Sequence, residues 1–260
     1  SYPSGTYQVM AEMEVYHNTT TGPKFQIIGD DCQIANVTLA PGETVTCEPG
    51  CMMYMTPDVD VTTTLEDTTS CCLRCCTGEN VCKIVYTNNA SNEGFIGLTT
   101  PIPGKIIPID LSAVGKFHCK FGSYLAAIGD DYDISMSFNC NCMGCCCGGQ
   151  GFANMSLSGQ AMVFLTAGGT ILQKELAEGE TLVVDSHSII GWAEGVRMSA
   201  RFAGGCCMCC CGGEGCFNTT LTGPGLVMIQ SMSFRKYYAS VSSMPKGSEG
   251  ATGGGDAVGE

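Results

Sequence analysis

The sequence MVFLTAGGTILQ, residues 162–173, is the clearest indication of secondary structure in the chain. Apolar residues alternate with small or polar ones on both sides of the Gly168-Gly169 pair. A period of two is typical of β-strands, and adjacent glycines are typical of the turn that joins two of them. We therefore predict two strands connected by a tight turn in this stretch.

Turn signals of this kind recur along the whole chain and favour an all-β fold. The 260 residues include 35 glycines and 10 prolines, and a hydrophobic fraction of 44% suffices for one large core. We predict a single β domain over residues 23–241. Residues 1–22 form an arm whose alternating segment QVMAEMEVY adds an edge strand or exchanges with a neighbouring subunit, and residues 242–260 form a flexible, Gly-, Ser- and acid-rich tail.

Three segments share a small residue, a glycine and then an alternating strand. They are APGETV (40–45), VGKFHC (114–119) and AEGETL (177–182). Self-similarity of this kind indicates internal repeats, and we predict three of them. We expect the repeat to be circularly offset, so that residues 213–234 are completed by the N-terminal strands between residues 25 and 65.

Longer stretches resemble the altered inheritance of mitochondria protein 24 family, which is found in bacteria and lower eukaryotes. They are PIPGKIIPIDL (101–111), TAGGTILQKELAEGETLVVDSHSIIGW (166–192), GGEG (212–215) and LTGPGLVMIQS (221–231). The resemblance runs from Phe25 to Phe234 and implies a prism or sandwich like the tryptophan RNA-binding attenuator protein. In that fold antiparallel sheets have pseudo-threefold symmetry and often assemble as trimers. The resemblance implies no reaction, because no catalytic residues are established for the family.

Three dense runs hold 14 of the chain's 20 cysteines, where the family carries short hydrophobic or glycine-rich turns. Each run follows a strand-like stretch, so three repeats would bring the runs together at one end of the domain. We predict that they are loops for attachment or assembly. Their cysteines are Cys71, Cys72, Cys75, Cys76, Cys140, Cys142, Cys145, Cys146, Cys147, Cys206, Cys207, Cys209, Cys210 and Cys211.

Three kinds of chemistry suit so many thiols. S-acylation would attach the loops to a membrane, since two or more acyl chains anchor stably, and the same apolar loops would otherwise contact other copies. Disulfides would indicate an extracellular, polymeric structural protein. No cofactor is otherwise expected, but thiolates would bind zinc or copper(I) through the C-x-x-C pairs Cys72 with Cys75, Cys142 with Cys145 and Cys206 with Cys209.

Four further cysteines are predicted to be buried thiols or single bridges, with the buried thiol favoured: Cys32, Cys47, Cys51 and Cys119. His118 and His187 are interpreted as structural residues in strands, and Lys174-Glu175 as an exposed strand pair. Glycosylation sequons at Asn18 and Asn89 lie in predicted loops and keep a secreted origin open.

Charge and motifs exclude two functional classes. A net charge of −13 with only 12 basic residues would repel a nucleic-acid backbone. The chain has no P-loop, G-x-S-x-G or H-E-x-x-H motif, so we expect no enzyme. The sequence instead favours a non-enzymatic β scaffold that binds copies of itself, and through its cysteine-rich loops a membrane lipid, at a cytoplasmic membrane surface.

Overall fold

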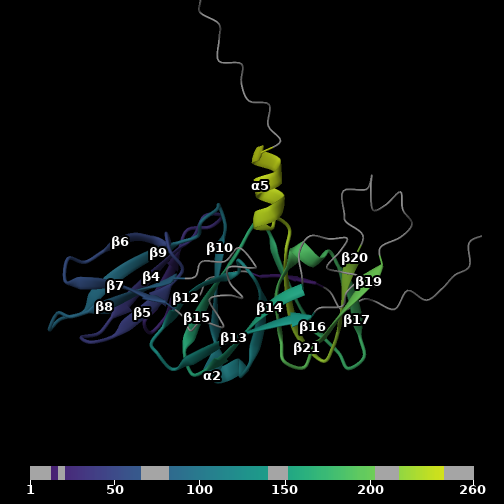
Figure 1. Ribbon diagram of the computed structural model, residues 1–260, viewed down its shortest axis with the longest axis horizontal. Coiled ribbons are helices and arrows are strands. Elements are labelled where there is room, and N and C mark those ends of the chain that lie inside the picture. Colours follow the sequence, from purple (N-terminus) through teal and green to yellow (C-terminus); the bar gives the residue numbers. More distant parts are fainter. Residues whose placement is uncertain (1–12, 17–20, 66–81, 140–151, 203–216, 243–260) are drawn as a thin grey trace, which may run out of the picture.

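The computed structural model describes residues 13–16, 21–65, 82–139, 152–202 and 217–242. Every strand pair in these residues is antiparallel, which confirms the all-β class. Figure 1 shows an elongated molecule in which the strands of residues 34–99 lie at one end of the long axis and those of residues 171–230 at the other.

The described strands form four sheets. The seven-stranded sheet has the order β1 (Glu14–Val15), β16 (Ile171–Leu176), β21 (Gly225–Gln230), β18 (Ile189–Ala193), β11 (Phe117–Lys120), β14 (Phe152–Gly159) and β13 (Tyr132–Asn139). The six-stranded sheet has the order β10 (Lys105–Asp110), β15 (Met162–Ala167), β12 (Tyr124–Ile128), β5 (Thr44–Cys47), β8 (Cys82–Asn88) and β7 (Val59–Leu65). The five-stranded sheet has the order β2 (Thr21–Gly22), β3 (Phe25–Ile28), β4 (Ile34–Leu39), β9 (Gly94–Thr99) and β6 (Met52–Met55). The three-stranded sheet consists of β17 (Thr181–Val184), β20 (Phe217–Thr222) and β19 (Arg197–Phe202).

The circular offset predicted from the sequence is wrong. Strands β20 and β21 pair with β17 and β19 and with β16 and β18, all of which lie between residues 171 and 202. The strands between residues 21 and 65 pair instead with one another or with β8, β9 and β12. Short connections favour pairing between strands that are close in sequence, because a short loop costs less entropy to close.

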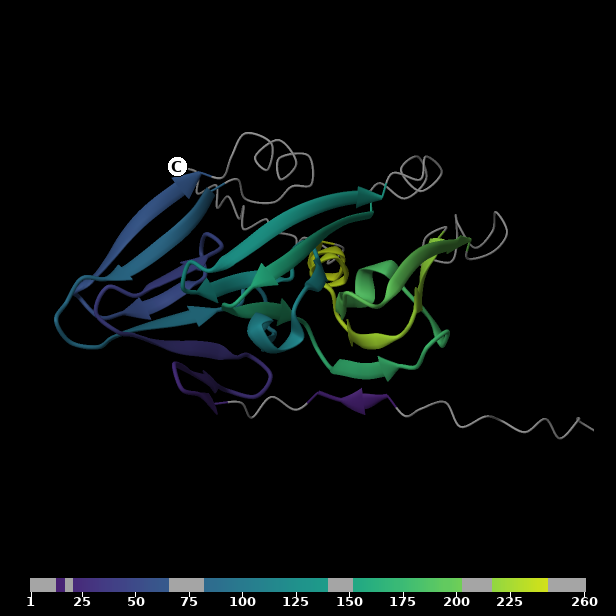
Figure 2. The ribbon, with the colours of Figure 1, turned by 90° about the horizontal axis from the view of Figure 1, so that it is seen from below.

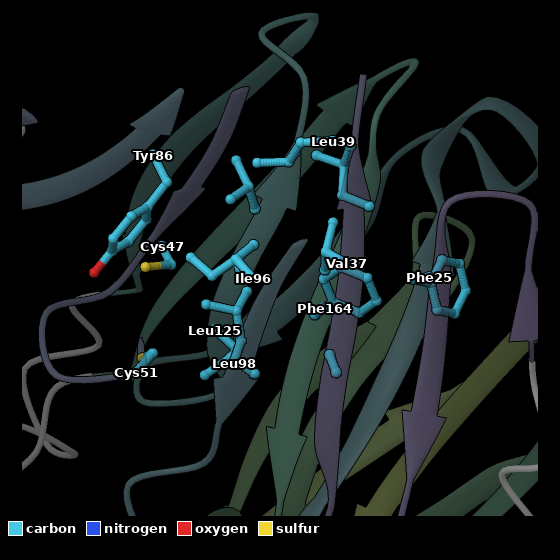
Figure 3. Packing of buried hydrophobic residues seen from close by; sticks show 14 of the residues in the cluster. Phe25, Val37, Leu39, Cys47, Cys51, Tyr86, Ile96, Leu98, Leu125 and Phe164 are labelled. Carbon is cyan, nitrogen blue, oxygen red and sulfur yellow. The ribbon is translucent and has the colours of Figure 1, made fainter. Parts of the chain in front are cut away.

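The core consists of three clusters of buried side chains along the long axis. The first joins β4, β5 and β9 to residues of β12 and β15, and the ring of Phe164 meets that of Phe25 edge-on with centroids 5.1 Å apart (Figure 3). The second joins residues between 107 and 167 to Ile171, Ile190 and Met228. The third lies within residues 176–227 and includes Trp192. Each of the first two clusters therefore depends on strands from the next stretch of the chain.

Two of the similar segments found in the sequence form the same turn. In Ala40–Glu43 and in Ala177–Glu180 the last amide donates to the first carbonyl, at 2.9 and 3.0 Å. Gly42 and Gly179 have positive φ angles of 79° and 75°, which a glycine adopts without steric cost. The glutamate side chain then accepts from the amide of the alanine, at 2.8 Å in the first turn and 2.9 Å in the second.

Helices are few in the described residues. The short α2 (Leu111–Val114) begins at Asp110, whose carboxylate accepts from the Ser112 amide, and a 3-10 turn occupies Ser186–Ser188. Helix α5 (Phe234–Ser242), which was not predicted from the sequence, projects from the body of the molecule in Figure 1. Phe234 and Tyr238, one helical turn apart, stack with ring centroids 6.3 Å apart and remain exposed.

The interpretation of Lys174-Glu175 as an exposed pair is wrong for the lysine. The Lys174 side chain on β16 is only 3% exposed, and its Nζ lies 2.6 Å from Oε1 of Glu180. The hydrogen bond from Lys174 lowers the pKa of Glu180 below its ordinary value. A two-residue period shows which residues share a face of a strand. It does not show that a lysine can lie on the buried face when an ion pair compensates its charge.

We expect Glu180→Gln to destabilise the protein above pH 5 more than Glu43→Gln does. Both glutamates hold the same turn, but Glu43 pairs with Lys24, whose side chain is 53% exposed and keeps its hydration, whereas Lys174 is buried. Because the folded-state pKa of Glu180 is lowered, its contribution is complete above the unfolded carboxyl pKa and disappears as the pH falls through the folded value. Thermal melts between pH 3 and 7 measure this, and equal losses in the two variants at pH 7 would contradict it.

Candidate functional site: three cysteine-bearing hairpins

Each cysteine run lies in the connection between two paired strands. Leu65 of β7 pairs with Cys82 of β8 across the first run, and Asn139 of β13 pairs with Phe152 of β14 across the second. Phe202 of β19 pairs with Phe217 of β20 across the third. The fourteen cysteines of the runs, including the six proposed metal ligands, lie outside the described residues. The structure therefore defines the strands that carry the runs: a β-hairpin in each of the three cases.

The three hairpins lie along one side of the molecule. In Figure 2 the arrowheads of β7 (blue), β13 (teal) and β19 (green), from which the runs continue, all end on the upper side of the view. Each of these strands is also the last strand of its sheet. Among the described strands, the hairpins thus occupy sheet edges and point the same way.

A lysine and two tyrosines connect the first hairpin to the second. Lys83 of β8 is buried, and its Nζ lies 5.4 Å from the ring centroid of Tyr124 and 5.7 Å from that of Tyr132. The two tyrosine hydroxyls are 3.3 Å apart, and burial raises the pKa of Tyr124. Cation–π contacts of a desolvated lysine are favourable, so they orient β8 relative to β13.

Most of the described cysteines lie inside the protein, where they are poorly suited to bind metal. Cys47, Cys51 and Cys119 are buried, as predicted, whereas Cys32 is exposed. A hydrogen bond to Cys51, together with burial, raises the pKa of Cys47, which keeps that thiol protonated. The described residues contain no cluster of three or more His, Cys, Asp or Glu side chains that could hold a metal ion.

Of the two predicted glycosylation sequons, the structure describes only the one at Asn89. Asn89 is exposed just after β8, and its Nδ2 donates to Oδ2 of Asp60 at 2.5 Å. Asn18 lies outside the described residues. The sequon at Asn154 belongs to the buried part of β14, where its side chain is only 3% exposed.

The two described histidines, His118 and His187, lie in different surroundings. His118 on β11 stacks on Trp192, with ring centroids 5.5 Å apart, and its Nδ1 lies 2.7 Å from the Ser156 hydroxyl. Burial lowers the pKa of His118, which favours a neutral ring. His187, predicted in a strand, lies instead in the 3-10 turn that follows β17.

A polar network around Asp185, which the sequence did not reveal, fixes the base of α5. The Asp185 carboxylate accepts from the His187 amide at 3.0 Å and lies 2.8 Å from Nζ of Lys236 on the helix. Arg235 reaches Nε2 of His187 at 2.8 Å. The hydrogen bonds to His187 and Lys236 outweigh burial and lower the pKa of Asp185. Beside this network a cavity of about 320 Å³ opens between β17 and the β16–β21 sheet.

Membrane attachment through a spanning helix finds no support in the described part of the chain. None of its helices has the length and apolar character needed to cross a bilayer.

Comparison with known proteins agrees with the fold. The crystal structure of protein SPYM3_0169 from Streptococcus pyogenes superposes with a TM-score of 0.67 over 84% of this chain and 98% of that chain, at 21% sequence identity. No curated protein matches the chain. The sequence profile of the family described as mitochondrial biogenesis AIM24 matches residues 25–232, which contain all but the first two described strands. The chain therefore belongs to the mitochondrial biogenesis AIM24 family.

Proposed function

We propose that the protein is a non-enzymatic, self-associating β scaffold built from three repeats, and that it presents three cysteine-rich hairpins on one side for attachment to a membrane by S-acylation. The observation that carries the proposal is the position of the cysteine runs. All three connect the two strands of a hairpin at a sheet edge, and all three hairpins point to the same side.

The strand pairing supports three repeats of six strands, over residues 34–99, 105–167 and 171–230. In the first, β4 and β6 flank β9 while β5 and β7 flank β8. In the second, β10 and β12 flank β15 while β11 and β13 flank β14. In the third, β16 and β18 flank β21 while β17 and β19 flank β20. Such repetition is expected of a fold similar to the tryptophan RNA-binding attenuator protein.

Charge favours acyl chains as the means of attachment. With a net charge of −13 the chain has no excess of Lys and Arg to bind anionic headgroups. Each acyl chain contributes about 0.8 kcal/mol per buried CH₂, and two or more chains anchor stably. Three hairpins on one side would place several chains in the same leaflet.

The proposal predicts thioester-linked lipid on the cysteine runs of the protein isolated from its native membranes. Intact mass before and after hydroxylamine should show a repeated lipid mass that hydroxylamine removes. Serine substitution of the fourteen run cysteines should move the protein from the membrane pellet to the supernatant. The matched control, Cys32→Ser, changes an exposed cysteine outside the runs and should leave sedimentation unchanged.

Other outcomes would identify the alternative chemistry. Loss of hydrogens in pairs, reversed by a reductant, would indicate disulfides and overturn acylation. A metal adduct seen only in native spectra would indicate a thiolate centre. Membrane sedimentation that persists in the serine variant would show that the runs are not the attachment site.

A further inference from the structure

Two sheet edges at opposite ends of the molecule have no strand partner among the described residues. Strand β6 ends the five-stranded sheet and β17 ends the three-stranded sheet. Figure 1 places β6 at one end of the long axis and β17 near the other. The corresponding strands elsewhere are paired across the repeats: β5 with β12, and β11 with β18. The pairing of β5 with β12, and that of β11 with β18, each joins one repeat to the next. Strand β17 of the last repeat corresponds to β5 and β11, and β6 of the first repeat corresponds to β12 and β18, so the two edges could form the same contact between molecules.

The two internal contacts have the same register. Val45, Thr46 and Cys47 pair with Ile128, Ala127 and Ala126 in the first. Phe117, His118 and Cys119 pair with Ala193, Trp192 and Gly191 in the second. Strands β12, β18 and β6 also share a one-residue bulge against their inner neighbours, at Leu125, Ile190 and Met53. Residues of β6 can thus be matched one by one with those of β12 and β18.

Burial differs between the internal strands and the edge. Leu125 and Ile190, at the bulge, are 1% and 0% exposed. Each packs into the core of the preceding repeat, Leu125 beside Val45 and Cys47 and Ile190 in the cluster of Phe117 and Cys119. Met53, at the same position of β6, is 58% exposed. Its neighbours Met52 and Tyr54 are also exposed, and so is Phe95 on the adjoining β9.

The other end offers the matching space. In the third repeat Leu182 and Val184 occupy the positions of Val45 and Cys47, but their cluster contains no residue from a following repeat. The cavity of about 320 Å³ lies there, lined by Leu182, Val183, Val184, Leu172, Ile229 and Met13 among others. A mainly apolar cavity beside a strand with one open edge among the described residues is suited to an apolar side chain from an added strand.

We infer that a second copy of this chain fills the site: β6 of one copy pairs antiparallel with β17 of the next, with Leu182, Val183 and Val184 opposite Thr56, Met55 and Tyr54. Met53 of the added copy enters the cavity between β17 and β16, as Leu125 and Ile190 enter the first two cores. The contact is head-to-tail, so it generates a ring or a filament whose repeats continue in one register. The inference specifies the partner surface for the self-association in the proposed function, and it does not depend on acylation.

Charged substitutions test the contact. Met53→Asp and Val183→Asp change exposed side chains, so each variant should fold while the charge prevents burial in the contact. In a reductant and without lipid, light scattering coupled to gel filtration should give a multiple of 27.2 kDa for the unmodified chain and 27.2 kDa for each variant. Met232→Asp and Val61→Asp are the matched controls, at similarly exposed methionine and valine positions, and should assemble normally.

Mixing the two variants identifies a head-to-tail contact. M53D retains an intact β17 edge and V183D an intact β6 edge, so the mixture should form a dimer of about twice 27.2 kDa, which neither variant forms alone. A monomeric unmodified chain, assembly that survives either substitution, or a mixture that stays monomeric would overturn the inference. None of these results bears on the acylation test. The reductant prevents disulfides between the cysteine runs, and without lipid the runs cannot bind a membrane, so neither contributes to the measured mass.

Discussion

Phe164→Ala is expected to lower the free energy of unfolding by about 3–5 kcal/mol, the usual cost of truncating a fully buried phenylalanine. Phe164 is 0% exposed and meets the ring of Phe25 edge-on. It belongs to β15 but packs into the first cluster, among residues of β4, β5 and β9 (Figure 3). The cavity left by the ring would therefore open between two of the proposed repeats, where the neighbouring strands are fixed by their own sheets and cannot move in to fill it.

Urea denaturation followed by circular dichroism measures this change. The matched control is Phe95→Ala, since Phe95 lies on β9 and is 40% exposed. We expect the control to change the unfolding free energy by less than about 1 kcal/mol. A Phe164→Ala midpoint that equals the control's would show that the first two repeats do not share a core. A loss of the single transition would show that they unfold separately.

The strand pattern and the glycine turns could be predicted from the sequence, because both are local. Alternation in residues 162–173 corresponds to β15 and β16, and Gly168-Gly169 joins them. The similar segments at residues 40–45 and 177–182 form the same glutamate-closed turn. Period and backbone conformation are properties of a few neighbouring residues, so tertiary contacts do not change them.

The pairing of strands and the contacts between residues distant in the sequence could not be predicted in the same way. The sequence led to a circular offset because residues 213–234 resemble the start of a repeat, yet a resemblance does not say which strands they join. The buried position of Lys174 depends on Glu180, six residues away and on the far side of a turn. Helix α5 was missed because its nine residues are too few for a strong period, and its base is fixed by Asp185, far away in the sequence.

The cysteine-rich site stays a prediction, because its fourteen cysteines lie outside the described part of the chain. From the sequence, the cysteine runs are expected to follow strands and to gather at one end of the domain. The strands β7, β13 and β19, which precede the runs, end on one side of the molecule, and each pairs with the strand that follows its run. What the sequence did not reveal is the pair of unmatched edges at β6 and β17, because an edge is defined only once the pairing of all the other strands is known.

Asn88→Ala is expected to cost about 3 kcal/mol of stability, because several buried polar groups lose their hydrogen bonds at once. Asn88 is 0% exposed at the end of β8. Its Nδ2 donates to the carbonyls of Leu39 and Asn92, each at 2.8 Å, and its Oδ1 accepts from the Ala90 amide at 3.1 Å. One side chain thus joins the end of β4 to the turn that leads into β9. Denaturant unfolding measures the loss, and Asn89→Ala, at the exposed neighbour, should change stability by less than about 1 kcal/mol.

The near-isosteric variant N88D separates lost hydrogen bonds from lost volume. It keeps the acceptor for Ala90 but turns a carboxylate oxygen toward the carbonyls of Leu39 and Asn92, so the ionised form is repelled and the pKa of the new carboxyl should rise. A raised folded-state pKa gives stability that is present at low pH and disappears as the pH rises through that value. We therefore expect N88D to be more stable at pH 5 than at pH 8 relative to the unmodified chain. A pH-independent difference would show that the two carbonyls find other donors, and that the junction between β4 and β9 does not depend on the amide of Asn88.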